Sequence, residues 1–259
     1  MKTLIASMLL ASILPFGSQG ITRSITLSGH EQKLHLYGVE SGRPVILSSG
    51  DGGWLHLAPH LAEQLAMRGY YVIGVDAKSY LSSGTGAQGL TPRDIARDYN
   101  TLLATYANGR RAILAGVSEG AGLSVVAAAD PHAQSHIAGV VTFGLGERNE
   151  LAWRWKDSLI YVTKRVPSEP TFNASDFISH LSPVPLAFIR STHDEFVPPT
   201  ESDHLIAAAS TPVRGRSTGR SRATWPGRRV STTIRDPRKA ASSALWVTNT
   251  VVRPESALT

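Results

Sequence analysis

The stretch Gly116-Val117-Ser118-Glu119-Gly120 lies between an apolar run at residues 111–115 and an alanine-rich run at residues 122–129. The apolar run predicts a buried strand and the alanine-rich run predicts a helix packed on it, so the serine falls on a tight strand-to-helix turn. Such a turn strains the serine backbone and brings neighbouring chain close, which favours residues without a Cβ at positions 116 and 120. The hydroxyl of Ser118 is then exposed at the positive end of a helix, the geometry of a nucleophile elbow.

Strands and helices are expected to alternate along most of the chain. The predicted strands cover residues 25–27, 33–37, 44–48, 71–75, 111–115, 137–143 and 186–189, and the predicted helices cover residues 58–65, 92–107 and 122–129. Residues 78–90, rich in serine and glycine, predict a mobile loop. This alternation predicts an α/β fold with a mainly parallel sheet that carries helices on both faces.

The chemically interesting residues follow the carboxyl ends of the predicted strands. They are the glycine-rich turn 50–53, Asp76, Ser118 and the segment 191–198. Active groups gather at this edge of a parallel sheet, so we expect these residues to lie together. A serine hydroxyl needs a base, an acid that orients the base, and N–H donors for the oxyanion.

Ser118 is the predicted nucleophile, and the backbone N–H of Glu119 is the first predicted oxyanion donor. The second donor is expected from the turn, at Asp51 or Gly52. Glycines there are also compatible with a plain helix entry or a phosphate-binding loop. Asp194, which directly follows a strand and lies after the serine in the chain, is the predicted orienting acid, with Asp76 as the alternative.

The catalytic base is the weak point of this pattern. Chain order puts the base after Asp194, and no histidine follows His204, which stands ten residues past that acid. His204 is therefore the candidate base, although the expected place is a loop after one further strand. His193 adjoins the acid, so its side chain should point elsewhere. The sequence predicts no metal site and no cofactor, because the helical pair at positions 56 and 60 lacks a third ligand.

The first 20 residues have the pattern of a secretory signal peptide. A charged Met-Lys start precedes a short apolar stretch, and small residues stand at Ser18 and Gly20. We therefore expect export to the periplasm, with a mature chain that begins near Ile21. The chain has no cysteine, which excludes disulfides, cysteine nucleophiles and thiolate metal sites.

The net charge of +6 belongs to the C-terminal tail. Residues 213–259 hold ten Lys and Arg against two acids, a balance of +8, which leaves residues 1–212 at −2. The tail is compatible with a basic arm that binds nucleic acid or anionic lipid, or with a disordered extension. Export and the scarcity of aromatic residues in the tail argue against nucleic acid as a partner.

The motifs together resemble the VirJ/AcvB family of exported, virulence-associated α/β-hydrolases. The resemblance covers about residues 40–212 and rests on the Ser49-Gly50-Asp51-Gly52-Gly53-Trp54 run, the segment 74–80, the elbow, and the segment 192–198. It implies periplasmic hydrolysis of aminoacyl-phosphatidylglycerol, such as the lysyl form, at the membrane surface. Some members have also been linked to type IV secretion, so secretion-system proteins are implied partners.

The chain departs from this family in two places. Glu119-Gly120-Ala121-Gly122 follows the serine, where the family has an aromatic residue and an acid nearby. From about Val213 the family's last strand, its histidine-bearing turn and its final helix are absent. The sequence thus predicts a hydrolase domain at residues 21–212 that lacks the last strand and helix, and a tail at 213–259 that is disordered or the product of a frameshift near codon 213.

Two functions follow from the sequence. One is a serine ester hydrolase, weak or inactive because the catalytic histidine is missing. The alternative is a non-catalytic exported binding protein, associated with virulence or secretion, that uses the hydrolase fold as a scaffold.

Overall fold

The computed structural model describes residues 20–84, 89–154, 169–191, 196–209, 228–234 and 247–253. The strands are β1 (Ile21–Leu27), β2 (His30–Tyr37), β3 (Arg43–Ser48), β4 (Tyr70–Val75), β5 (Ala112–Val117), β6 (Ile137–Phe143), β7 (Arg148–Glu150), β8 (Thr171–Asn173), β9 (Leu186–Ser191), β10 (Arg228–Ile234) and β11 (Val247–Arg253). The helices are α1 (Leu57–Ala66), α2 (Ala77–Ser82), α3 (Pro92–Tyr106), α4 (Glu119–Ala129), α5 (Pro131–Gln134), α7 (Ala174–Ile178) and α8 (Pro199–Ala209).

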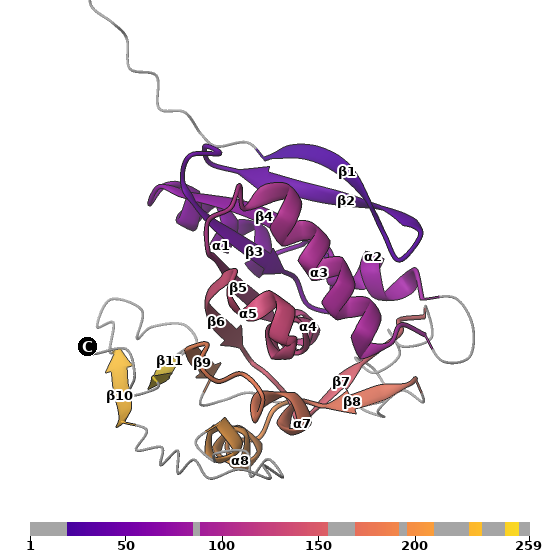
Figure 1. Cartoon of the computed structure of the whole chain (residues 1–259). Coiled ribbons are helices and arrows are strands. Elements are labelled where there is room, and N and C mark those ends of the chain that lie inside the picture. The colour runs from indigo at the N-terminus through magenta and orange to yellow at the C-terminus, as the bar shows by residue number, and fades with distance from the viewer. Residues whose placement is uncertain are drawn as a thin grey trace, which may run out of the picture.

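One nine-stranded sheet forms the centre of the molecule, in the order β1-β2-β4-β3-β5-β6-β9-β11-β10 (Figure 1). The five strands from β4 to β9 pair in parallel, while β1 and β2 at one end pair antiparallel. Strands β7 and β8 form a separate small antiparallel pair. The prediction of a mainly parallel α/β sheet is therefore confirmed.

Strands β3 and β4 are buried on both faces because their side chains alternate between two cores. In β3, Ile46 belongs to the larger core with residues of α3, α4, α7 and α8, whereas Val45 and Leu47 belong to a smaller core with α1. Strand β4 divides in the same way, with Ile73 in the larger core and Val72 in the smaller one. Helices thus cover both faces, and the continuous apolar runs of the sequence reflect this two-sided burial.

Helix α4 is the central helix of the larger layer. It contacts β5, β6, α3 and α7, and most of its residues are buried. Its run of glycine and alanine allows this close approach on all sides. Because the helix is buried all round, it carries no polar face.

Helix α3 begins with the predicted cap. The Thr91 hydroxyl accepts the Asp94 N–H and the Asp94 carboxylate accepts the Thr91 N–H, which completes a capping box, with Pro92 at the first helical position. The hydrogen bonds from Thr91, followed by the nearby Arg97, hold the pKa of Asp94 below its ordinary value, although burial acts in the opposite direction. The segment before α3 differs from its prediction, because residues 77–82 form the short helix α2 rather than part of a loop.

The sheet also continues beyond its predicted end. The sequence predicted no strand after residues 186–189, but β11 pairs antiparallel with β9, and β10 pairs with β11. Both added segments are rich in valine and threonine, which favour extended backbone, and β9 offers its edge for pairing. Outside these two segments, the disordered tail predicted for residues 213–259 stays a prediction. The frameshift near codon 213 stays a prediction.

None of the helices in the described ranges combines the length and apolar character needed to cross a bilayer. The predicted signal peptide falls almost wholly within residues 1–19, which lie outside the described residues.

Candidate active site

The backbone of Ser118 has the strained conformation expected of a nucleophile elbow. Its φ is 49° and its ψ is −119°, a positive φ that a residue with a side chain adopts only when its surroundings impose it. The N–H of Ser118 donates to the carbonyl of Phe143 at 2.8 Å, which ties the elbow to the end of the neighbouring strand β6. The serine stands at the start of α4, and its hydroxyl makes no capping bond to the helix.

The glycines on both sides of Ser118 are required by close backbone contacts. A Cβ on Gly116 would lie 2.0 Å from the carbonyl oxygen of Gly120, and a Cβ on Gly120 would lie 2.2 Å from the carbonyl oxygen of Ser49. Neither distance is possible for real atoms, and each partner is backbone that cannot rotate away. The steric reason inferred for positions 116 and 120 therefore holds.

The glycine-rich turn lies directly against the elbow. The N–H of Gly53 donates to the carbonyl of Gly50 at 3.0 Å and closes the turn. A Cβ on Gly50 would lie 3.2 Å from the Cβ of Ser118, so the turn and the serine are in contact. The turn carries the backbone N–H groups of Asp51 and Gly52. The N–H of Glu119 belongs to the first turn of α4, where N–H groups have no partner within the helix. The predicted oxyanion donors thus lie on the two segments that meet at Ser118.

The side chain of Glu119 is a feature that the sequence did not predict. This half-buried carboxylate accepts the N–H of Glu150 at 2.8 Å and faces Asp51. Burial, and to a lesser degree the charge of Asp51, raise the pKa of Glu119 from 4.5 to about 7, although the bond from Glu150 favours ionisation. A carboxyl group with a pKa close to 7 therefore directly follows Ser118, the predicted nucleophile.

Glu119→Gln is expected to raise the melting temperature at pH 8 and to leave it nearly unchanged at pH 4. The folded protein holds the Glu119 proton up to about pH 7, whereas the unfolded chain releases it near pH 4.5, so folding stability falls as pH rises between these values. Glutamine removes this loss while keeping the shape of the side chain. Thermal unfolding of both proteins from pH 4 to 9 measures the effect, and a difference in melting temperature that is independent of pH would contradict it.

The predicted acid, Asp194, lies outside the described residues, so its role stays a prediction. The alternative acid, Asp76, accepts the N–H of Ser79 at 3.0 Å with one carboxylate oxygen and the N–H of Trp54 at 3.1 Å with the other. Both oxygens are engaged by backbone, and Asp76 is the N-cap of α2. Asp76 therefore serves as a turn residue, and its role as the alternative acid stays a prediction.

The candidate base, His204, lies on α8 with 67% of its side chain exposed. Its Nδ1 is 3.4 Å from the Oε2 of Glu147, and the hydroxyl of Ser175 donates to the other oxygen of that carboxylate. Among the described residues, Ser118 is not a hydrogen-bond partner of His204. Glu147 carried no motif that would have marked it in the sequence, and the assignment of His204 as base stays a prediction.

The histidines at positions 56 and 60 are both exposed, His56 just before α1 and His60 on it. Within the described ranges, no three acidic or histidine side chains gather in a way that could hold a metal ion.

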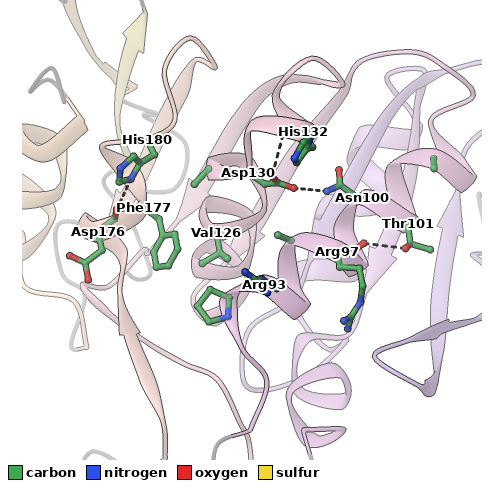
Figure 2. A pocket seen from close by; sticks show the side chains of 14 residues that line it. Arg93, Arg97, Asn100, Thr101, Val126, Asp130, His132, Asp176, Phe177 and His180 are labelled. Atoms are coloured by element: carbon green, nitrogen blue, oxygen red, sulfur yellow. Dashed lines mark hydrogen bonds between the residues drawn. The ribbon is translucent and has the colours of Figure 1, made fainter. Parts of the chain in front are cut away.

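Two further features of the surface lie outside the elbow. Beside the glycine-rich turn, the ammonium group of Lys78 lies 4.2 Å above the ring of Trp153, a cation–π contact. Apart from it, a groove of about 890 Å³ runs between α3, α4, α5 and α7 (Figure 2). Its lining includes Arg93, Val126 and Phe177 but none of the predicted catalytic or oxyanion residues.

The comparison with known families supports the resemblance inferred from the motifs. Residues 43–158 match the family of the bacterial virulence protein VirJ. The matched segment runs from β3 to beyond β7 and so includes the glycine-rich turn and the elbow. The similarity to VirJ is thereby confirmed over these residues, whereas the similarity to AcvB stays a prediction. No curated protein matches the sequence at a significant level.

Solved structures confirm the α/β-hydrolase fold. One similar structure is a membrane phospholipase A described as a bacterial virulence factor, with 15% identity and a TM-score of 0.54 over 75% of this chain and 77% of the other. A thioesterase domain from the curacin biosynthetic pathway has 11% identity and a TM-score of 0.53, covering 73% and 89%. A putative carboxylesterase from Lactobacillus plantarum has 16% identity and a TM-score of 0.51, covering 74% and 82%. The chain therefore has an α/β-hydrolase fold and contains a segment that is similar to the VirJ family.

Proposed function

We propose that this protein is an exported serine ester hydrolase of the periplasm that acts on aminoacylated phospholipid at the membrane surface. The observation that carries the proposal is the elbow itself, in which Ser118 has a φ of 49° and lies against the turn of Gly50. A strained serine beside two segments that carry backbone N–H groups is compatible with acyl transfer. The match to VirJ supports a role in virulence.

The side chain of Glu119 supports an aminoacyl substrate. Glu119 directly follows Ser118, and its carboxylate faces Asp51 and forms no ion pair with any lysine, arginine or histidine of the described residues. The amino group of an aminoacyl ester carries a positive charge, and an acid close to the scissile bond would attract it. A substrate with a neutral acyl chain gains nothing from this charge.

A fluorophosphonate probe on the purified protein tests the nucleophile. We expect the probe to label Ser118 in the wild type and to leave Ser118→Ala unlabelled. Labelling should be slow if the base is missing, because an incomplete triad retains only the part of catalysis due to the oxyanion hole and binding. Release of lysine from lysyl-phosphatidylglycerol in mixed micelles tests the substrate. Equal labelling of the two proteins would refute the assignment of Ser118.

The second candidate is a non-catalytic exported binding protein on the same scaffold, with secretion-system proteins as partners. The exposure of His204 and its pairing with Glu147 favour this candidate, since a base for Ser118 is not found among the described residues. Absence of labelling and of lysine release, together with equal capture of a secretion component by wild type and Ser118→Ala, would support it.

A further inference from the structure

Asp76 connects the start of α2 to the glycine-rich turn. One carboxylate oxygen accepts the N–H of Ser79 within the first turn of α2, and the other accepts the N–H of Trp54, the residue that follows the turn. Gly53 has a φ of +82°, and a Cβ on it would lie 3.3 Å from the Asp76 carboxylate. The carboxylate therefore lies close against the last residue of the turn and fixes the direction of the peptide that leaves it.

A second contact links the same two segments. The hydroxyl of Ser49 accepts the N–H of Ala77 at 3.0 Å and donates to the carbonyl of Gly50 at 3.3 Å. The residue before the turn is thus bound to α2 as well, so the start and the end of the turn are both held by the segment that Asp76 begins.

The ring of Trp54 holds the far side of the turn. It stacks on His35 with centroids 4.8 Å apart and planes 5° apart, and its Nε1–H donates to the hydroxyl of Tyr37 at 3.4 Å. A Cβ on Gly74 would lie 2.2 Å from the indole, so the ring occupies the space that a side chain on β4 would fill. Because the ring cannot shift, the hydrogen bond from the Trp54 N–H to Asp76 sets the orientation of the turn beside it.

We propose that Asp76 is a positioning residue that holds the oxyanion turn Gly50–Gly53 against Ser118. The chain of contacts runs from the Asp76 carboxylate through Gly53 and Trp54 to Gly50, whose Cα adjoins the serine. The proposal rests on the proposed function, because the turn supplies an oxyanion donor only if Ser118 is a nucleophile. Asp76 itself touches neither the substrate nor the reacting atoms.

The test compares Asp76→Ala and Asp76→Asn with the control Asp130→Ala. Asp130 caps α5 by accepting the N–H of His132 and also accepts the side-chain amide of Asn100, so its loss removes a helix cap of similar kind elsewhere in the fold. With p-nitrophenyl butyrate as substrate and the full chain as enzyme, we expect Asp76→Ala to lower kcat about 10- to 100-fold, with KM changed less than about threefold. Asparagine retains one acceptor oxygen and should restore part of kcat.

Hydrogen exchange of the peptide that covers residues 49–55 gives a readout independent of activity. We expect faster exchange there in Asp76→Ala and no change in Asp130→Ala. Equal kcat values for Asp76→Ala and Asp130→Ala, or unchanged exchange at residues 49–55 in Asp76→Ala, would overturn the positioning role. If the wild type neither hydrolyses the ester nor reacts with a fluorophosphonate, the proposed function fails, and the exchange measurement alone then decides whether Asp76 holds the turn.

Discussion

Gly116→Ala is expected to abolish fluorophosphonate labelling of Ser118 and to lower the melting temperature by at least about 6 °C. The added Cβ would lie 2.0 Å from the carbonyl oxygen of Gly120 and 2.5 Å from the backbone nitrogen of Ala121. Both atoms belong to the first turn of α4, which cannot move without displacing Ser118. Overpacking against backbone of this kind costs about 3 kcal/mol, which corresponds to roughly 6–12 °C in a domain of this size.

The matched control is Gly52→Ala, in the neighbouring turn. A Cβ at Gly52 meets nothing within 4 Å, and its φ is not positive, so alanine should be accepted there with an unchanged melting temperature. Thermal unfolding and probe labelling of the two variants measure the contrast. Retention of labelling in Gly116→Ala would contradict the steric argument, because it would show that the elbow accommodates a side chain at position 116.

The parts of the fold that the sequence predicted are those specified by local chemistry. The elbow follows from the bracketing glycines, and the start of α3 follows from Thr91, Pro92 and Asp94, whose side chains form a capping box with their own backbone. The apolar runs predicted the parallel strands because those strands are buried on both faces. Each of these signals lies within a few residues of the feature that it predicts.

The parts that the sequence missed depend on contacts between distant segments. The helix α2 was predicted as a loop because its serines favour turns, but Asp76 caps it and Tyr80 and Leu81 are buried by other elements. The strand β11 depends on the exposed edge of β9, and its own residues give no sign of that partner.

The candidate site divides in the same way. The elbow and the turn could be predicted, because short motifs specify them. The burial of Glu119, by contrast, depends on Glu150 and Asp51, which are 31 and 68 residues away in the chain, so no local pattern could reveal its raised pKa. The partner of His204 is likewise set by distant packing, because α8 lies beside Glu147, the residue that directly precedes β7.

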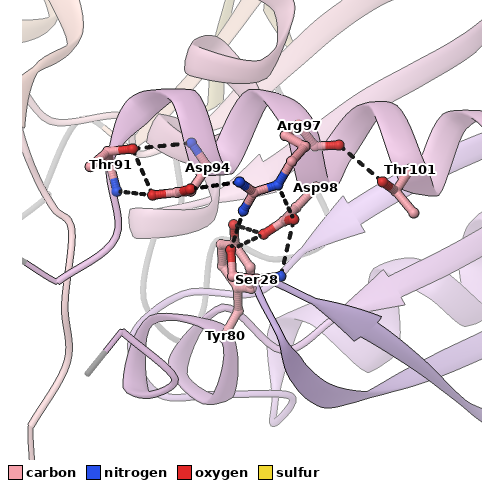
Figure 3. A network of polar contacts seen from close by, with 7 residues as sticks. All are labelled: Ser28, Tyr80, Thr91, Asp94, Arg97, Asp98 and Thr101. Carbon is pink, nitrogen blue, oxygen red and sulfur yellow. Dashed lines mark hydrogen bonds and ion pairs between the residues drawn. The ribbon is translucent and has the colours of Figure 1, made fainter.

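Asp98→Ala is expected to destabilise the protein by about 3 kcal/mol, which lowers the melting temperature by roughly 6–12 °C. Only 3% of Asp98 is exposed, and its carboxylate joins three segments (Figure 3). It accepts the N–H of Ser28 at 3.1 Å and the Ser28 hydroxyl, both from the β1–β2 turn, and the hydroxyl of Tyr80 in α2 at 2.8 Å. The Nε of Arg97 lies 3.4 Å away. Alanine leaves the buried Tyr80 hydroxyl without its acceptor, which accounts for much of the cost.

Asp94→Ala, one turn earlier on α3, is the control for this variant. Asp94 is a capping residue at the exposed start of the helix, where loss of the cap costs about 1 kcal/mol and roughly 2–4 °C. Tyr80 belongs to α2, and the N-cap of that helix, Asp76, adjoins the glycine-rich turn. Asp98→Ala should therefore also speed hydrogen exchange at residues 49–55, whereas Asp94→Ala should not. If both variants lowered the melting temperature equally, the buried carboxylate would not be the contact that fixes α2 and the hairpin to α3.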